Sequence, residues 1–348
     1  MMKQKPILGI TMGDPSGNGP ELCVKALSQE RVYDICRPVV IGDAGVIEKA
    51  AREAVKLKDI VVHPVSSIGE CFFKLGTIDV YDLHNVQIEK LKIRMVDAMS
   101  GDAAFTSVKK AIELAMSGEI DATVTNALNK EALNLAGHHY AGHTEIYADL
   151  TGTKNYSMML AEGDLRVVHV STHVSLREAC ERVKKDRVRK VIEIAHNTCK
   201  KLGIKEPRVA VAGLNPHSGE NGLFGREEIE EITPAIEEAR AGGVNVDGPI
   251  PPDTIFAKAN GGLYDIVVAM YHDQGHIPLK LLGFQYDREK GKWKAVKGVN
   301  ITLGLPIIRS SVDHGTAFDQ AWQGSSSELS LISAIEYAVL LAENNDQA

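Results

Sequence analysis

Short apolar runs alternate with longer amphipathic segments along this chain, and that alternation limits the folds open to it. Runs such as 6–13 (PILGITMG) and 121–127 (DATVTNA) have the length and composition of buried strands, whereas 105–118 (FTSVKKAIELAMSG) has apolar residues at helical spacing. Strands separated by helices are typical of βαβ units, in which neighbouring strands run parallel. The sequence therefore predicts an α/β fold with a largely parallel sheet.

Four segments give more local expectations. Residues 156–173 (YSMMLAEGDLRVVHVSTH) predict two strands joined by a Gly-Asp turn, and 176–202 predict a long charged helical region. Residues 298–309 (GVNITLGLPIIR) read as one strand. The polar stretch 286–298 (YDREKGKWKAVKG) predicts an exposed hairpin or loop.

Length, charge and cysteine usage exclude several classes of protein. The 348 residues are enough for two lobes, and the net charge of −7 argues against a nucleic-acid partner. No apolar run is long enough to cross a bilayer, and the first residues lack a secretory signal. Five cysteines without a CxxC pair favour reduced thiols. We therefore expect a cytoplasmic protein that binds neither nucleic acid nor membrane.

Three histidines each close a predicted strand: His173, His217 and His272. Ligands of open α/β sheets bind beyond the carboxyl ends of the strands, so these imidazoles are expected to converge. Three imidazoles with an open position suit zinc and also other divalent ions. A structural role is the more common one for any single histidine, but the shared placement of all three favours a metal site.

Candidate anion-binding residues accompany the histidines. Lys280, Asn300 and Arg309 lie near strand ends, where cations clamp phosphates or carboxylates, although a surface charge is the alternative. His143 and Thr144 stand at an expected helix start, whose free N–H groups favour an anion. A simple threonine cap explains that pair equally well.

Two glycine-bearing turns precede helices. Residues 9–21 (GITMGDPSGNGPE) lack both the G-x-G-x-x-G and the G-K-[ST] spacing, so they fit neither a dinucleotide fingerprint nor a Walker loop. Residues 311–324 (SVDHGTAFDQAWQG) place a His-Gly turn before a helix that contains Asp319. On local grounds, a tight turn that needs glycine explains both as well as a binding role does.

Taken in order, long motifs resemble those of the 4-hydroxythreonine-4-phosphate dehydrogenase (PdxA) family across nearly the whole chain. They are GDPSGNGPE, GHTE, STH, GLNPHSGENGLFG, PPDT, YHDQGHIPLKLLGF and GVNITLGLPIIRSSVDHGTAFD. The resemblance implies the isocitrate/isopropylmalate dehydrogenase-like fold. It implies two lobes with a cleft between them, here 1–137 plus 301–348 and 138–300, and a homodimer whose active site is completed by the second subunit.

The resemblance also implies roles for the candidate residues. By its motifs, a divalent metal (Zn, or Mg, Mn or Co) is expected to bind His173, His217 and His272. The substrate is expected to contact His143, Thr144, Lys280, Asn300 and Arg309. NAD is expected to contact the two glycine-bearing turns, at Gly13, Asp14, His314, Gly315, Thr316 and Asp319. For the catalytic proton transfer Lys280, Asp253 and His143 all remain open.

Two departures from the vitamin B6 enzymes of that family bear on the substrate. The chain has TNALNKEAL where those enzymes commonly read Thr-Gly-Pro-Val-His-Lys, and it carries the polar insertion YDREKGKWKAV at 286–296. It looks closer to the PdxA2 branch, which implies NAD-dependent oxidative decarboxylation of 4-phospho-D-threonate or 4-phospho-D-erythronate. The alternatives are 4-phosphohydroxy-L-threonine as substrate, a non-redox metal-dependent hydrolase or aldolase, a phosphate acyltransferase, and an inactive ligand sensor.

Overall fold

The computed structural model describes residues 4–289, 292–296 and 298–344. Contacts divide the chain into two compact units: unit 1 combines Met1–Lys154 with Leu305–Glu343, and unit 2 comprises Asn155–Gly304 and Asn344–Ala348. We expected lobe boundaries at 137 and 300 from the sequence; the compact units divide after 154 and 304. Each unit has its own sheet segment and its own apolar core.

Unit 1 contains a parallel sheet, as the alternating pattern predicts. Its strands follow the order β3-β4-β2-β1-β5-β14, and each recorded pairing is parallel. The strands are β1 (Ile7–Thr11), β2 (Arg37–Gly42), β3 (Val61–Val65), β4 (Thr77–Asp82), β5 (Ala122–Thr125) and β14 (Arg309–Val312). Because the pairs are parallel, the carboxyl ends of β1, β5 and β14 meet at one edge of the sheet.

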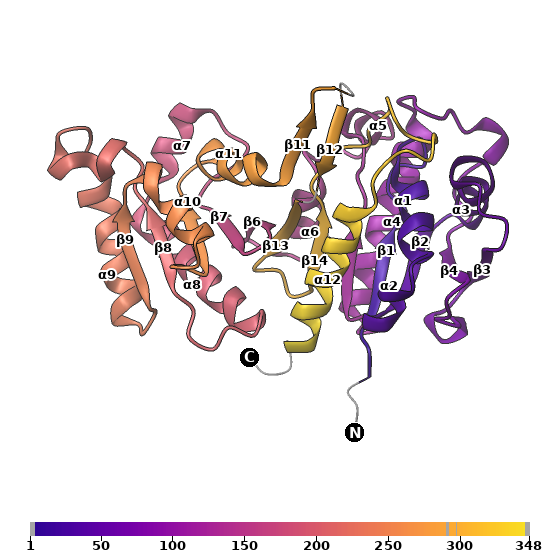
Figure 1. Ribbon diagram of the computed structural model, residues 1–348, viewed down its shortest axis with the longest axis horizontal. Coiled ribbons are helices and arrows are strands. Elements are labelled where there is room, and N and C mark those ends of the chain that lie inside the picture. Colours follow the sequence, from indigo (N-terminus) through magenta and orange to yellow (C-terminus); the bar gives the residue numbers. More distant parts are fainter. Residues whose placement is uncertain (1–3, 290–291, 297, 345–348) are drawn as a thin grey trace. The chain divides into compact units, whose positions relative to one another are not determined.

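Helices and helical turns connect these strands (Figure 1). Ala111 and Leu114 of α4 pack on Val39 and Ile41 of β2, and all four side chains are buried. The helical elements are α1 (Gly19–Leu27), α2 (Glu30–Ile35), α3 (Ala44–Lys49), η1 (Ala50–Val55), η2 (Ile68–Glu70), η3 (Ile88–Lys90), α4 (Ala98–Met116), α5 (Lys130–Leu135), α6 (His143–Leu150) and α12 (Leu329–Asn344). The fold class expected from the sequence is therefore confirmed.

Unit 2 combines antiparallel and parallel pairing, in the order β13-β6-β7-β10-β8-β9. β6 pairs antiparallel with β13 and β7, and the other pairs are parallel. The strands are β6 (Ser157–Glu162), β7 (Leu165–His169), β8 (Val209–Ala212), β9 (Val246–Ile250), β10 (Ile266–Ala269) and β13 (Val299–Leu303). The Gly163-Asp164 turn between β6 and β7 is confirmed, whereas no sequence pattern indicated β9, because that strand contains Gly248 and Pro249.

The single strand expected over 298–309 is wrong: the structure has two strands there, β13 and β14. The break between the strands is at Gly304, which has a φ of +87°. A Cβ added there would lie 2.4 Å from the carbonyl oxygen of Asn155. Only glycine accepts both conditions, so the chain turns there. The turn takes β14 into the parallel sheet of unit 1 beside β5.

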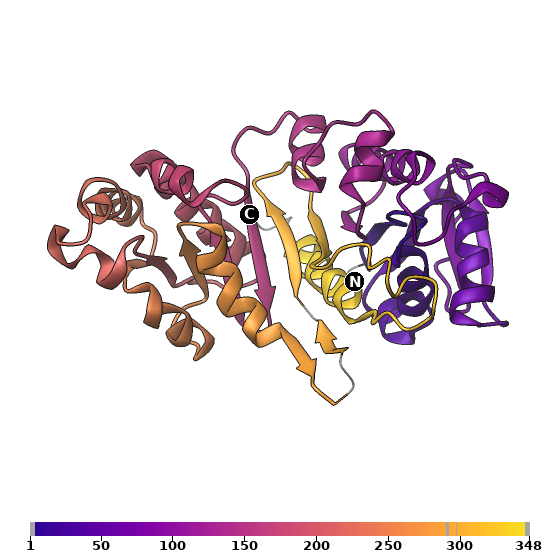
Figure 2. The same cartoon turned by 90° about the horizontal axis from the view of Figure 1, so that it is seen from above.

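The helices of unit 2 are α7 (Leu176–Arg182), α8 (Lys185–Lys201), α9 (Thr233–Ala241), α10 (Pro252–Asn260) and α11 (His272–Gly283), with η4 (Pro216–Gly222) and η5 (Glu228–Ile232). The long region expected over 176–202 is thus two helices that break near Val183. After α11, β11 (Phe284–Asp287) pairs antiparallel with β12 (Lys292–Val296), so the described part of 286–298 forms a hairpin (Figure 2). Residues 290, 291 and 297 lie outside the described ranges.

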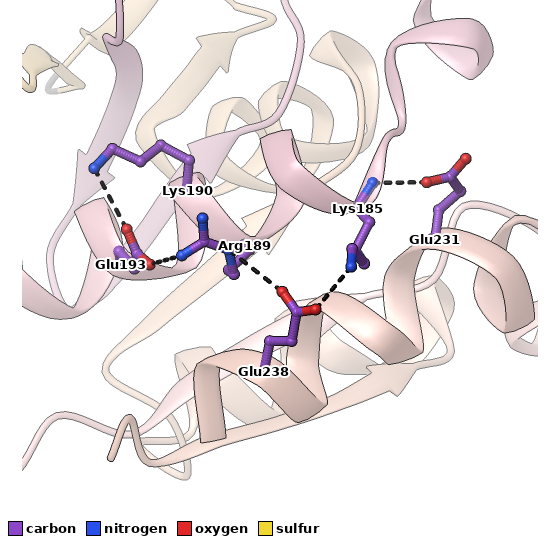
Figure 3. Close-up of polar contacts among 6 residues, drawn as sticks. All are labelled: Lys185, Arg189, Lys190, Glu193, Glu231 and Glu238. Carbon is purple, nitrogen blue, oxygen red and sulfur yellow. Dashed lines mark hydrogen bonds and ion pairs between the residues drawn. The ribbon is translucent and has the colours of Figure 1, made fainter. Parts of the chain in front are cut away.

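Charged side chains join α8 to α9 and η5 (Figure 3). Lys185 Nζ lies 2.7 Å from Glu238, and its backbone N–H donates to Glu231 at 2.7 Å. Arg189 Nε lies 3.5 Å from Glu238. These side chains are well solvated, so the network orients these helices more than it stabilises them.

All five cysteines are free thiols. Burial raises the pKa of Cys23, Cys36 and Cys199 to about 12, so these thiols stay protonated and unreactive. None of the helices in the described part of the chain combines the length and apolar character that crossing a membrane requires.

Candidate active site

Two neighbouring parallel strands of unit 2 bring two of the expected metal ligands together. β7 pairs with β10 in parallel, with Val167 opposite Val267, so their carboxyl ends lie at the same edge. His173 follows β7, and His272 begins α11 after β10. Their ring centroids are 5.9 Å apart.

This spacing and chemistry fit two ligands of one metal ion. Two imidazoles on one tetrahedral zinc, with Zn–N bonds near 2.0 Å, place their ring centroids roughly 5 Å apart. Nδ1 of His272 lies 2.6 Å from Oδ1 of Asp273, which leaves Nε2 of that ring to face a metal. The pair therefore fits zinc or a similar divalent ion.

The third expected ligand, His217, lies in η4 after β8 and has a ring contact with Phe224 at 6.4 Å between centroids. In the described residues of one chain, no group of three or more His, Cys, Asp or Glu side chains is arranged to hold a metal. A three-histidine centre therefore stays a prediction, and with η4 in this conformation its missing ligand would have to come from a second subunit.

Two further histidines, His276 and His169, pack next to His272. The ring of His276 stacks on that of His272 with centroids 3.6 Å apart and planes 13° apart, and His169 lies 4.8 Å from His276. Burial lowers the pKa of His169 to about 4 and that of His276 to about 3, so both are neutral near pH 7. The stack fits a packing role for His276.

Gln274 joins two of the strand ends that carry histidines. This buried side chain accepts a hydrogen bond from the N–H of Met270 at 2.7 Å and donates to the carbonyl oxygen of Gly213 at 2.8 Å. Ser171 after β7 donates to the carbonyl oxygen of Met270 at 3.1 Å. The segments after β7, β10 and β8 are therefore tied to one another, a link that no sequence signal indicated.

Arg309 of unit 1 is a buried cation rather than a surface charge, with 3% of its area exposed. It begins β14, donates to Oγ1 of Thr125 at 2.8 Å, and lies over the ring of Tyr147. Burial lowers the pKa of Arg309 to about 10, which still leaves the guanidinium charged near pH 7. Thr125 and Tyr147 were not among the expected site residues; their role depends on strand pairing that the sequence does not display.

The start of α6 lies near this cation. His143 and Thr144 are its first residues, so free backbone N–H groups are available there. Burial, and then the charge of Arg309, lower the pKa of His143 well below its usual range. Nε2 of His143 is buried and has no hydrogen-bond partner among the described residues. The imidazole of His143 is therefore neutral near pH 7, and an anion site formed by these groups stays a prediction.

The remaining candidates for substrate binding and proton transfer lie on three different elements of unit 2. Lys280 lies on α11 with Nζ 4.4 Å from the ring centroid of Phe284, and Asn300 on β13 donates to Sδ of Met158 at 3.0 Å. Asp253 is exposed in the first turn of α10. Their convergence on one substrate stays a prediction.

The two loops expected to hold the dinucleotide pack together in unit 1. The N–H of Asn18 donates to the carbonyl oxygen of Thr316 at 3.0 Å, and a Cβ on Gly17 would lie 3.0 Å from Cβ of Thr316. His314 and Gly315 precede this contact in the chain, and Asp319 follows it. The carbonyl groups of Phe318 and Asp319 accept hydrogen bonds from Arg94. The six candidates thus lie on adjoining loops.

Asp14 is the buried acid of these loops. Gly13 before it has a φ of +77°, and a Cβ there would lie 2.7 Å from the carbonyl oxygen of Ala127. Oδ1 of Asp14 accepts from the N–H of Ser16 at 2.8 Å. Burial, together with the charge of Asp97, raises the pKa of Asp14 to about 6. Glycine is required at 13, and the adjacent carboxyl is poised to titrate near neutrality.

Comparison with known proteins identifies close relatives. The chain matches the family described as pyridoxal phosphate biosynthetic protein PdxA over residues 34–338. D-Threonate 4-phosphate dehydrogenase from Salmonella typhimurium is 49% identical over 96% of this chain and 98% of its own length. The enzyme of that name from Cupriavidus necator is 47% identical over 97% of both. The crystal structure of 4-hydroxythreonine-4-phosphate dehydrogenase from Klebsiella pneumoniae is 43% identical, with a TM-score of 0.84 over 97% of this chain and 100% of that one.

Proposed function

The chain belongs to the PdxA family of dehydrogenases, and we propose that it catalyses NAD-dependent oxidative decarboxylation of 4-phospho-D-threonate. The fold is that of isocitrate/isopropylmalate dehydrogenases. The observation that carries the proposal is the adjacent pair His173 and His272, which offers a metal site to a hydroxy acid. Relatives named for D-threonate 4-phosphate favour that substrate over 4-phospho-D-erythronate and 4-phosphohydroxy-L-threonine.

The residues that would hold a divalent ion are His173, His272 and, by the family motif, His217. When bound, such an ion supplies Lewis acidity, which eases removal of the hydroxyl proton and stabilises the charge left on loss of carbon dioxide. Asp273 fixes the orientation of His272, and the neutral ring of His276 supports its face. These contacts hold the ligand in place without adding a positive charge beside it.

Arg309 and the start of α6 supply the positive potential for the substrate phosphate. The guanidinium is charged, buried and held by Thr125, so it offers N–H donors in a fixed direction. Thr144 adds a hydroxyl group, and His143 is neutral. We assign Lys280 and Asn300 to the same substrate, and Lys280, Asp253 or His143 to proton transfer, on the family motifs.

The nicotinamide dinucleotide is assigned to the adjoining loops of unit 1. Backbone groups of Gly13, Gly315 and Thr316, with the side chains of Asp14, His314 and Asp319, are the proposed contacts. The packing of the loop before α1 against Thr316 supports one shared surface.

A homodimer completes the proposed site. Ile277, Leu281 and Leu282 of α11 are 65%, 78% and 42% exposed, and Tyr286 beyond them is 60% exposed. Apolar side chains gathered on one short segment favour contact with another subunit. A second subunit there would lie beside α11, the helix that begins with His272. Free thiols throughout the chain support a cytoplasmic location.

The test is a direct assay. The purified chain is incubated with NAD and zinc, manganese or magnesium, and nicotinamide reduction is followed with each of the three phospho-acids. We expect the highest kcat/KM with 4-phospho-D-threonate, and release of carbon dioxide in step with reduction. Preference for 4-phosphohydroxy-L-threonine would move the chain to the vitamin B6 reaction. No reduction with any of the three would overturn the proposal.

A further inference from the structure

The turn that carries His217 has an unusual backbone. His217, Ser218, Gly219, Glu220 and Asn221 all have positive φ, at 52°, 55°, 81°, 44° and 55°. A left-handed residue other than glycine costs roughly 1–2 kcal/mol, and such residues normally occur singly. Four non-glycine residues of this kind within a run of five therefore persist only if neighbouring groups hold them.

One buried carboxylate provides that support. Oε1 of Glu228 accepts hydrogen bonds from the backbone N–H groups of Leu214 and Asn215, both at 2.7 Å. Oε2 accepts from Nδ2 of Asn215 at 2.9 Å. Glu228 is 3% exposed, so its charge is satisfied by these three donors rather than by water. The carboxylate thereby fixes the segment that leads from β8 into η4.

The same carboxylate lies against the left-handed turn. A Cβ on Gly219 would be 2.8 Å from Oε2 of Glu228, so the turn and the carboxylate are in close contact. Glu228 begins η5, and Glu231 on that element accepts a hydrogen bond from the backbone N–H of Lys185, the first residue of α8 (Figure 3). The support for the turn is therefore anchored to a long helix.

We propose that Glu228 is a positioning residue: it holds η4 in its left-handed conformation so that the imidazole of His217 is preset for metal binding. This rests on the proposed function, because it concerns the third ligand of that metal. Glu228, rather than the metal, keeps η4 in its strained backbone conformation. His217 therefore does not have to rearrange when the ion binds.

Glu228→Gln is the informative change because it keeps the shape of the side chain. An amide has one oxygen, so its NH2 group would face either the two backbone N–H groups or the side-chain amide of Asn215. At least one donor is then left buried without an acceptor, and the segment before η4 shifts. Asn215→Ala is a milder second variant, since it removes one donor and leaves the carboxylate bound to both backbone N–H groups.

The measurement is cobalt(II) binding to the metal-free full-length protein, followed by the visible spectrum of the bound ion. We expect Glu228→Gln to raise the dissociation constant roughly 10- to 100-fold, and Asn215→Ala to raise it less. Turnover of Glu228→Gln should recover when metal is in excess, a recovery that a merely unfolded variant would not show. Glu230→Gln is the control, because Glu230 lies on the same element but pairs with exposed Arg226.

The outcomes separate the two proposals. If the wild-type protein binds metal and oxidises phospho-acids while both variants bind with unchanged affinity, the positioning role fails and the function stands. If the wild type binds cobalt without turnover, the function fails, and the affinities of the variants still decide the role of Glu228. A wild type that binds no metal overturns both. Should Glu228→Gln not fold, Asn215→Ala decides.

Discussion

The guanidinium of Arg309 lies over the aromatic ring of Tyr147, with Cζ 5.5 Å from the ring centroid. Strand β14 supplies the cation and helix α6 supplies the ring. The face of an aromatic ring attracts a cation without neutralising it, so the charge remains available to a ligand. A buried arginine held in this way is well suited to bind an anion.

Arg309→Ala should mainly weaken substrate binding. Loss of a charge-assisted contact worth roughly 1.5–3 kcal/mol predicts a rise of about 10- to 100-fold in KM for the phosphorylated substrate. Steady-state kinetics test this, with Arg208→Ala as control, because Arg208 forms an exposed pair with Asp265. An unchanged KM would remove Arg309 from the site.

Asp14→Asn should stabilise the protein above pH 6. The folded state holds the pKa of Asp14 at about 6, against an ordinary value of 3.8 for an aspartate, so the folded chain binds more protons between these values. Stability from this group therefore falls as pH rises from about 4 to 6, by about 3 kcal/mol in total, and stays lost above that range. Urea unfolding at pH 5 and pH 8 should show a larger gain at pH 8. Asp164→Asn, a change at an exposed carboxyl, should alter the stability at neither pH. Equal gains for Asp14→Asn at both pH values would contradict the raised pKa of Asp14.

His173→Ala and His217→Ala should each lose bound metal and nearly all turnover. Imidazole ligands cannot be replaced by alanine, and removing the metal from wild type with a chelator should have the same effect on activity. Metal content per chain and kcat are the measurements, with exposed His84→Ala as control. Full metal content in His217→Ala would show that the third ligand lies elsewhere.

Gln274→Glu should weaken both the fold and the metal site. A carboxylate still accepts from the N–H of Met270 but cannot donate to the carbonyl oxygen of Gly213, which is left opposite a negative charge. We expect a loss of about 1–3 kcal/mol in the free energy of unfolding and lower metal affinity. Chemical denaturation and metal titration test this against exposed Gln320→Glu. Wild-type stability in Gln274→Glu would mean that the link between strand ends is dispensable.

Much of the fold could be predicted from the sequence because buried strands and amphipathic helices leave regular patterns. The turn at Gly163 and the strands that precede the histidines were visible in this way. The break between β13 and β14 at Gly304 was not predictable, because one glycine in an apolar run does not show that two strands belong to different units. β9 was missed since Gly248 and Pro249 are poor strand formers.

The candidate site was predictable where a motif names the residue and unpredictable where the role arises from contact. Strand-end position indicated His173 and His272, and the structure places their rings side by side. Gln274 and Glu228 carry no such signal, because their importance lies in backbone groups that they reach across the fold. The roles of the motif residues in catalysis remain predictions.

Unit 2 is largely one continuous stretch, whereas unit 1 needs the later segment that contains β14 and α12. During synthesis, residues up to 154 emerge first, and β5 lacks its β14 neighbour until the whole of 155–304 has been made. An unpaired strand edge is prone to wrong pairing. The edge of β5 is therefore open to wrong pairing until β14 is made, and the strand that ends this exposure also carries Arg309.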